Sequence, residues 1–292
     1  MSKALRDDVL RHLPIDGEKA FTSANGRFRE KLKRQQLNIL RPFVPALKHV
    51  LEADEEILLA ARAISPVKFV EELTTGLFIF MIRRCVLVVT DRRILHFPSN
   101  PGFGPRDSLS QTWFTDIASF KAGRKIRIRY KNGSREIFHR VLNGRKFGKV
   151  VSGLTRGSSA STQYRGRHSV CPKCTSALVV ESYTCPQCRL QFKDPHTARL
   201  FSLSLPGAGY FYTRHPFLGI ADILLQLPLL FFLFLYVLSD FVGPDRFQGS
   251  FTIPAVLTGI LIVEKMINIY HAENFVREYI PVERIFRKIS RD

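Results

Sequence analysis

The chain has 292 residues and a formal net charge of +19. Residues 1–216 hold 37 Lys and Arg against 17 Asp and Glu, a difference of +20, so the excess charge lies ahead of the long apolar stretch. A charge of this size attracts nucleic acid or anionic lipid and does not by itself distinguish them. Four of the five Cys fall between positions 171 and 188, which argues against a disulfide framework. Residues 1–8 lack the apolar core of a signal peptide, so we expect the N-terminal region to stay in the cytoplasm.

The first 53 residues predict a charged, solvated helical extension. Residues 27–36 are dense in Lys and Arg, and Pro42 and Pro45 should break or kink any helix that precedes them.

Residues 54–155 predict a β-rich domain that ends in a helix over residues 144–155. The expected strands cover residues 56–64, 84–90, 94–97, 109–114, 117–121, 125–131 and 135–141.

The clearest hairpin alternates polar and apolar residues with a period of two and turns at the Asn-Gly pair 132–133. Both turn residues tolerate positive φ, which favours a two-residue loop. With that loop, Arg129 faces Glu136, and Ile128 faces Ile137 on the core side.

Two segments of this region have a less regular pattern. The apolar run 76–82 is too short to span a bilayer and is followed by Arg83 and Arg84, so we interpret it as buried structure. Residues 156–169, rich in Ser, Gly, Thr and Arg, predict a flexible basic linker.

Two motifs in the β-rich region resemble those of the bacterial pleckstrin-homology-like family. Residues 86–95 read VLVVTDRRIL, which is similar to that family's strand–TDRR–strand signature, and residues 113–120 read WFTDIASF, similar to its next strand pair. The resemblance implies a seven-stranded, strongly bent sheet with a C-terminal helix and no fixed catalytic residues. Residues 66–82 depart from the family pattern.

The four clustered Cys form two C-P-x-C knuckles separated by ten residues. Tetrahedral zinc needs four ligands, and two tight turns supply them in pairs. A closed four-cysteine site favours a structural Zn²⁺ ion over a catalytic one, and a redox dithiol does not need two matched pairs. We therefore predict a zinc ribbon over residues 170–193 with the ligands Cys171, Cys174, Cys185 and Cys188.

A basic run in the second half of the β-rich region could bind anionic lipid or an acidic partner, and each basic residue near an anionic leaflet contributes about 1 kcal/mol. A solvated strand face and phosphate-backbone binding are the alternatives. The candidate residues are Lys125, Arg127, Arg129, Lys131, Arg140, Arg145 and Lys146.

Two apolar stretches, residues 217–239 and 251–270, are long enough to cross a membrane. They predict a transmembrane hairpin over residues 217–271, although the second stretch could also be a buried core helix. Basic charge on either side places residues 1–216 and a basic tail, 272–292, in the cytoplasm and the hairpin in the inner membrane.

The segment 203–212, LSLPGAGYFY, resembles the start of the two-transmembrane-helix domain family, whose members often show a PGxGxxY element before the first span. The resemblance implies that residues 197–216 form an interfacial or re-entrant segment. The charged residues that this family usually has near its second helix are not clearly matched.

Asp222 and Lys265 lie at similar depth in an antiparallel hairpin, so we predict that they pair or reach the same interface. The eight His are scattered, and no phosphate-binding Gly loop or nucleophile elbow occurs, so no catalytic constellation is expected.

Taken together, the sequence predicts an α+β protein with a helical extension, a bent antiparallel sheet, a zinc ribbon and a membrane hairpin. The expected role is a non-enzymatic membrane adaptor that binds anionic lipid or a protein partner, which could be a second copy of the chain. An accessory subunit of a larger inner-membrane complex is the alternative, and membrane-tethered nucleic-acid binding is a weaker one.

Overall fold

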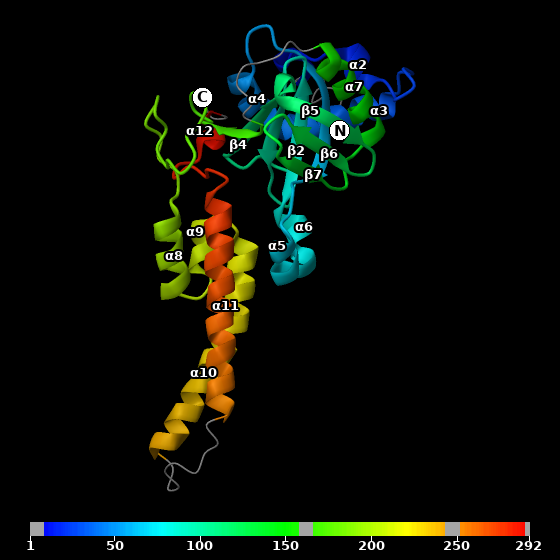
Figure 1. Ribbon diagram of the computed structural model, residues 1–292. Helices are drawn as coiled ribbons and strands as arrows, with labels where there is room; N and C mark the ends of the chain where they lie inside the picture. The colour runs from blue at the N-terminus through cyan, green and yellow to red at the C-terminus, as the bar shows by residue number, and fades with distance from the viewer. Residues whose placement is uncertain (1–8, 158–165, 243–251, 290–292) are drawn as a thin grey trace. The chain divides into compact units, whose positions relative to one another are not determined.

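The computed structural model describes residues 9–157, 166–242 and 252–289. The chain divides into two compact units, which are coloured along the chain in Figure 1. Unit 1 comprises Met1–Gln191 and Pro281–Asp292, and unit 2 comprises Phe192–Ile280. The fold is mixed α+β with antiparallel sheets, as predicted.

The N-terminal extension is part of the core of unit 1 rather than a solvated arm. Its helices are α2 (Gly17–Phe21), α3 (Glu30–Leu40), the 3₁₀ turn η1 (Arg41–Phe43) and α4 (Val44–Val50). Leu37, Leu40, Phe43 and Leu47 are fully buried. Their spacing of three or four residues forms one apolar stripe, which has to be covered.

A buried amide joins this extension to the first strand. Gln36 in α3 is 1% exposed, and its Nε2 donates to the Ala60 carbonyl at 2.9 Å while its Oε1 accepts from the Ala60 N–H at 2.7 Å. Both polar ends of the side chain are thereby satisfied in the core.

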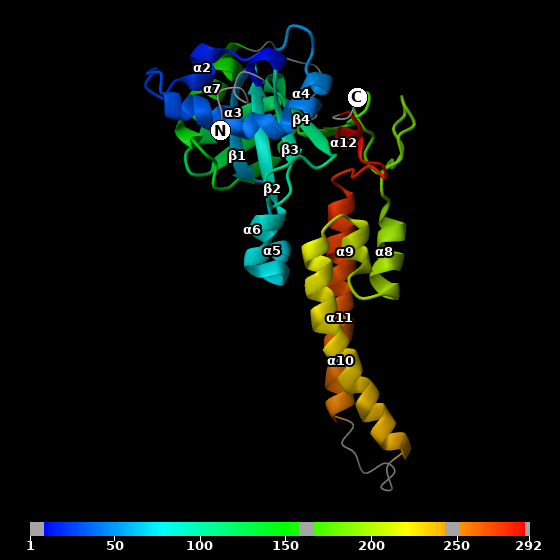
Figure 2. The ribbon, with the colours of Figure 1, turned by 180° about the vertical axis from the view of Figure 1, so that it is seen from behind.

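The larger sheet of unit 1 is antiparallel, with strand order β1-β2-β3-β4-β8. Its strands are β1 (Ile57–Ile64), β2 (Arg84–Thr90), β3 (Arg93–Pro98), β4 (Leu109–Trp113) and β8 (His168–Val170). Strands β1 to β3 are almost continuously buried, because helices cover one face and the second sheet covers the other (Figure 2).

The smaller sheet has the order β5-β6-β7, with β5 (Ile117–Ala122), β6 (Ile126–Tyr130) and β7 (Arg135–Phe138). The 3₁₀ turn η3 (Phe114–Asp116) precedes it and the helix α7 (Gly144–Gly157) follows it. The inward side chains of both sheets and of α7 form one apolar core.

The predicted register of the β6–β7 hairpin is wrong by one residue. Ile128 faces Glu136 on the core side, and Arg129 faces Arg135 on the outer side. The Lys131 N–H donates to the Asp116 carbonyl at 2.9 Å instead of continuing the hairpin, so the loop has three residues and ends at Gly133 with φ 85°.

The apolar run that we interpreted as buried forms an exposed projection between β1 and β2. It consists of α5 (Phe69–Thr75), η2 (Gly76–Phe78) and α6 (Ile79–Ile82). Ile79 is buried, but Phe78 is 63% exposed and Met81 is 41% exposed. The interpretation as buried structure is therefore wrong for most of this run.

The predicted linker is also more ordered than expected at both ends. Helix α7 continues to Gly157 and β8 begins at His168, while residues 158–165 lie outside the described part of the chain. Just before β8, the Arg167 guanidinium binds the Glu136 carboxylate, with Nε–Oε1 at 2.9 Å. Strand pairing and this ion pair hold the end of the linker against the domain.

The TDRR motif closes the β2–β3 turn and supplies a buried ion pair. The Thr90 hydroxyl accepts from the N–H groups of Arg92 and Arg93. The Arg93 side chain, 4% exposed, binds the fully buried Glu55 carboxylate through two bonds of 2.9 and 2.6 Å. This bidentate geometry makes a strong, directional pair.

A buried histidine lies between β3 and its neighbours. His96 is 4% exposed, and its Nε2 and Nδ1 lie 2.8 Å from Ser65 Oγ and 3.0 Å from Ser110 Oγ. Burial, with smaller contributions from the charges of Arg167 and Arg83, holds the pKa of His96 well below its ordinary value of 6.5.

This depressed pKa predicts acid sensitivity of unit 1. The unfolded chain binds a proton at His96 more readily than the folded chain does. The contribution of neutral, buried His96 to stability is therefore complete above pH 6.5 and is lost as pH falls towards the folded pKa. We expect a slope of about 1.4 kcal/mol per pH unit in that window, measured by denaturant unfolding. His96→Gln should flatten this slope, and the exposed control His196→Gln should leave it unchanged. An unaltered slope in His96→Gln would contradict the assignment.

The elements of unit 2 are helices, as far as its described residues show. Its helices are α8 (Pro195–Ser204), α9 (Ala208–Tyr212), α10 (Pro216–Val242) and α11 (Thr252–Val276). By length and composition, residues 216–239 and 252–276 could each cross a membrane. Only 17% and 11% of their apolar windows are buried, which is unlike the core helix of a soluble protein.

Two glycines shape the connection from α8 to α9. Gly207 adopts φ 73°, and a Cβ there would lie 2.4 Å from the Gly219 carbonyl oxygen. A Cβ at Gly209 would lie 1.9 Å from Ser202 Oγ. The PGAG sequence therefore allows α8, α9 and α10 to pack with their backbones in close approach.

The predicted basic tail is not a free segment over its described residues. Helix α12 (Ile285–Ile289) belongs to unit 1, where the Phe286 N–H donates to Asp107 Oδ1 at 2.9 Å. The Phe286 ring is buried beside Phe97, with the ring centroids 6.3 Å apart. This stretch packs on unit 1 because it carries apolar side chains among its basic residues.

Candidate functional site

The two Cys knuckles are structural repeats offset by fourteen residues. In the first, the Cys171 N–H donates to the Ser176 carbonyl, and in the second the Cys185 N–H donates to the Leu190 carbonyl, each at 2.9 Å. The residue after each second Cys, Thr175 or Arg189, has positive φ, 58° or 55°. Isolated antiparallel bridges close each repeat, Val170 with Ala177 and Thr184 with Gln191.

These repeats bring the four predicted ligands together. All four Sγ atoms lie within 4.8 Å of one another, and the closest pairs, Cys171 with Cys188 and Cys174 with Cys185, are 3.5 Å apart. A tetrahedron with metal–sulfur bonds of 2.3 Å has edges of about 3.8 Å. The sulfur atoms therefore fit one four-coordinate metal ion, whose identity stays a prediction.

The surroundings of the cluster favour the thiolate at Cys185 and the thiol at Cys171. Burial opposes ionisation of Cys185, but N–H donors from Cys188 and Gln187 and the Ser176 hydroxyl outweigh it and lower the pKa of Cys185 to about 6. Burial raises the pKa of Cys171. A metal ion would supply the charge that keeps such a buried thiol deprotonated.

The ribbon is fastened to unit 1 rather than hinged on a linker. Strand β8 pairs with β4 directly ahead of the first knuckle. His49 of α4 donates through Nε2 to the Lys173 carbonyl at 2.7 Å, and the Val282 N–H donates to the Gln191 carbonyl at 3.0 Å. A metal ion here would stabilise the contact of several chain segments.

Most of the predicted basic residues are exposed. Those with exposed side chains are Lys125, Arg127, Arg129, Lys131, Arg140 and Arg145. Lys146 is the exception, because it is 6% exposed and its Nζ donates to the Ala20 carbonyl at 2.7 Å. Burial lowers the pKa of Lys146 to about 8. Lys146 holds the N-terminal extension to α7, so its assignment to a surface binding site is wrong.

Four cations cluster on the outer side of the smaller sheet, which we call the basic face: Lys121, Arg127, Arg129 and Arg135. Arg129 lies directly opposite Arg135, and Arg127 lies directly opposite Lys121. The fully exposed residues of β5, β6 and β7 include no Asp or Glu. Like charges opposite one another destabilise a sheet, so an anionic ligand would stabilise this arrangement.

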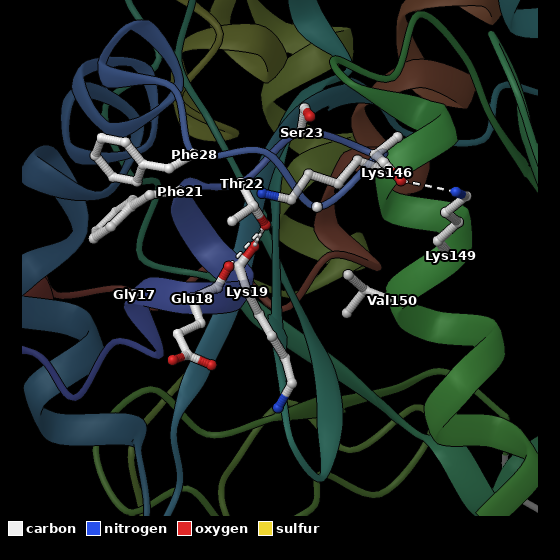
Figure 3. Close-up of a pocket in the computed structure, with 12 residues that line it drawn as sticks. Gly17, Glu18, Lys19, Phe21, Thr22, Ser23, Phe28, Lys146, Lys149 and Val150 are labelled. Carbon is white, nitrogen blue, oxygen red and sulfur yellow. Dashed lines mark hydrogen bonds between the residues drawn. The ribbon is translucent and has the colours of Figure 1, made fainter.

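An open pocket of about 810 Å³ lies between α7 and α2 with its following loop; Figure 3 shows the side chains that line it. Lys149 reaches from α7 to the Ala24 carbonyl at 2.7 Å. Phe28, 59% exposed, lies at its rim. Lys146 binds a backbone carbonyl of α2 and Lys149 one of the following loop, so these two amines join α2 and its loop to α7.

A polar cluster in unit 2 corrects the predicted pair of Asp222 with Lys265. Asp222 Oδ2 accepts from the Gly207 N–H at 2.6 Å and from Gln226 Nε2 at 2.8 Å, while Oδ1 accepts from Asn268 Nδ2 at 2.7 Å. Lys265 Nζ instead donates to the Ser202 carbonyl at 3.0 Å. Asp222 thus fixes the α8–α9 turn and joins α10 to α11.

The same cluster contains a second carboxylate. Glu264, 8% exposed, also accepts from Asn268 Nδ2, so one amide nitrogen bridges two carboxylates. Gln226 Oε1 and Glu264 Oε2 are buried and have no hydrogen-bond partner among the described residues. Two carboxylates that share one amide donor repel each other.

Asp222 was predicted as a site residue, but its partners Gln226 and Asn268, and Glu264 beside them, were missed by the sequence analysis. Asp222 and Gln226, and Glu264 and Asn268, are spaced by four residues, which places each pair on one helix face and could have revealed the cluster. His96 and Arg167 had no such signal, because their partners are distant in sequence.

Comparison of this chain with protein-family models, with curated proteins and with solved structures finds no match.

Proposed function

We propose that the chain is a non-enzymatic membrane adaptor whose pleckstrin-homology-like domain, residues 54–155 of unit 1, binds anionic lipid headgroups through the basic face. The observation that carries the proposal is the opposed pairing of Arg129 with Arg135 and of Arg127 with Lys121. Phosphate groups satisfy such clusters through charge-assisted hydrogen bonds, and guanidinium groups suit them geometrically.

In this proposal, α10 and α11 form the membrane anchor. Their exposed apolar surfaces need an apolar environment, and two crossings return the chain to the side on which it entered. The excess of Lys and Arg in residues 1–216 favours the cytoplasmic side of the inner membrane.

The metal centre has a structural role in the same proposal. Four thiolates leave no open coordination position, and zinc is the ion that suits a tetrahedral sulfur site. The ribbon would fix the residues from which the chain continues into unit 2.

Energy transfer from the sole tryptophan, Trp113, to dansylated headgroups tests lipid binding in the full chain, reconstituted in nanodiscs. We expect more transfer in anionic than in zwitterionic lipid, and loss of this difference at high salt. The double variant Arg127→Glu/Arg129→Glu should abolish the difference. The control Arg27→Glu/Arg29→Glu changes the charge equally at exposed residues of the extension and should retain it.

Equal transfer in both lipids would contradict the proposal. Partners that co-purify through α10 and α11 would then favour a subunit of a larger membrane complex. Binding to nucleic acid with a steep salt dependence would favour membrane-tethered nucleic-acid binding instead.

A further inference from the structure

Five large apolar side chains are exposed on the projection between β1 and β2, residues 65–83, which we call the finger. Figures 1 and 2 show α5 and α6 extending beyond the ends of the strands. The exposed fractions are 77% for Phe69, 48% for Val70, 72% for Leu73, 63% for Phe78 and 41% for Met81. A soluble surface rarely concentrates such side chains in one short segment.

The base of the finger is polar and firmly held. Glu71 and Arg83 form an ion pair there, with side chains 3% and 9% exposed. The Ser65 N–H donates to the Arg83 carbonyl at 2.8 Å, which extends the pairing of β1 with β2. The Thr74 hydroxyl donates to the Val70 carbonyl at 2.7 Å, so this polar group is satisfied within the finger.

Basic side chains lie beside the finger. The Arg140 guanidinium lies over the Phe80 ring, 5.1 Å from its centroid. Lys68, at the start of α5, is exposed. The exposed apolar side chains and the basic residues beside them together match the acyl chains and the headgroups of an anionic leaflet.

We propose that the finger inserts its apolar side chains into the interfacial region of an anionic bilayer, as a membrane contact additional to α10 and α11. The inference rests on the proposed function, because that function keeps unit 1 beside a membrane. A bilayer is the occupant because the apolar side chains come from three successive elements, α5, η2 and α6, and basic residues lie beside them.

The test uses tryptophan reporters in full-length chains that also carry Trp113→Phe. Phe69→Trp reports on the finger, and Phe234→Trp, at an exposed position of α10, reports on the anchor. Val180→Trp is the matched control, because Val180 is an 82% exposed apolar residue of the ribbon. Each variant is reconstituted in nanodiscs of anionic lipid with or without bromine on the acyl chains, and its emission is compared.

We expect bromine to reduce the emission of Phe69→Trp and Phe234→Trp and to leave Val180→Trp unchanged. Quenching of Phe69→Trp should persist at high dilution of protein in lipid, where each disc holds one chain.

Emission of Phe69→Trp that is blue-shifted but unaffected by bromine would show that protein, a second copy or another chain, covers the finger. Red-shifted, unquenched emission would show that it stays in water. Either result overturns the inference. Quenching of Phe234→Trp in the same experiment would still support α10 as part of the membrane anchor. Loss of quenching in Phe234→Trp would instead contradict the proposed function.

Discussion

Cys185→Ser is expected to abolish stoichiometric metal binding and to unfold residues 170–191. The four Sγ atoms form a closed set, so three ligands leave a weakened, open site. Few apolar side chains of this segment are buried, and metal binding therefore supplies most of its folding free energy, on the order of 10 kcal/mol in comparable sites. Metal content by mass spectrometry and proteolysis between residues 170 and 191 measure both effects.

The remaining cysteine provides the control. Cys85 lies in β2, away from the cluster, so Cys85→Ala should retain one metal ion per chain. Acid should release the metal from the natural chain, because protons compete with it for the thiolates. A Cys185→Ser chain that keeps both its metal and its protection from protease would contradict a structural four-cysteine centre.

Glu55→Gln is expected to destabilise unit 1 by about 3–5 kcal/mol, the usual cost of leaving one partner of a buried ion pair uncompensated. The Arg93 guanidinium would keep at most one of its two bonds to residue 55, would lose the negative charge that compensates it, and could not reach bulk water. The Arg93 guanidinium carbon lies 5.2 Å from the centroid of the Trp113 ring, so tryptophan fluorescence follows unfolding at this position.

The control is Glu52→Gln, because Glu52 pairs with Arg92 while 46% exposed, and such a surface pair contributes at most about 1 kcal/mol. Burial opposes ionisation of Glu55, but its bonds to Arg93, to Thr90 and to the Glu52 N–H together outweigh this effect and lower its pKa below 4.5. The stabilisation is therefore present above pH 4.5 and lost as pH falls through the folded pKa. Equal, small effects of both variants would contradict the assignment.

Local patterns predicted the elements of unit 1 well. All seven strands expected over residues 56–141, and the helix after them, occur within a few residues of their predicted bounds. The hairpin register was wrong because a distant carbonyl, that of Asp116, binds the Lys131 N–H, and no local turn preference contains that information.

Two predictions were wrong because they were based on the charge of the residues and not on their packing. The basic residues of the extension suggested a solvated helix, although the spacing of Leu37, Leu40 and Leu47 already indicated a buried stripe. Lys146 was grouped with exposed cations, but a lysine can place its amine on a backbone carbonyl and become part of the core.

The candidate sites differ in how many of their contacts the sequence could predict. Knuckle spacing alone identified the four Cys that come together and could bind a metal ion, because each turn brings its own pair together. The partners of Asp222 could not be predicted in this way, because the packing of α10 on α11 determines whether Lys265 or Asn268 approaches the carboxylate.

Residues 281–289 complete unit 1 although both helices of the hairpin precede them in the chain. The bond between Phe286 and Asp107 joins positions 179 residues apart. During synthesis, the ribosome must therefore release the hairpin before unit 1 can reach its final packing, whereas N-terminal domains usually fold first. Unit 1 can therefore complete its packing only after α10 and α11 have been synthesised, and a chain truncated between these helices would leave the surface around Phe97 uncovered.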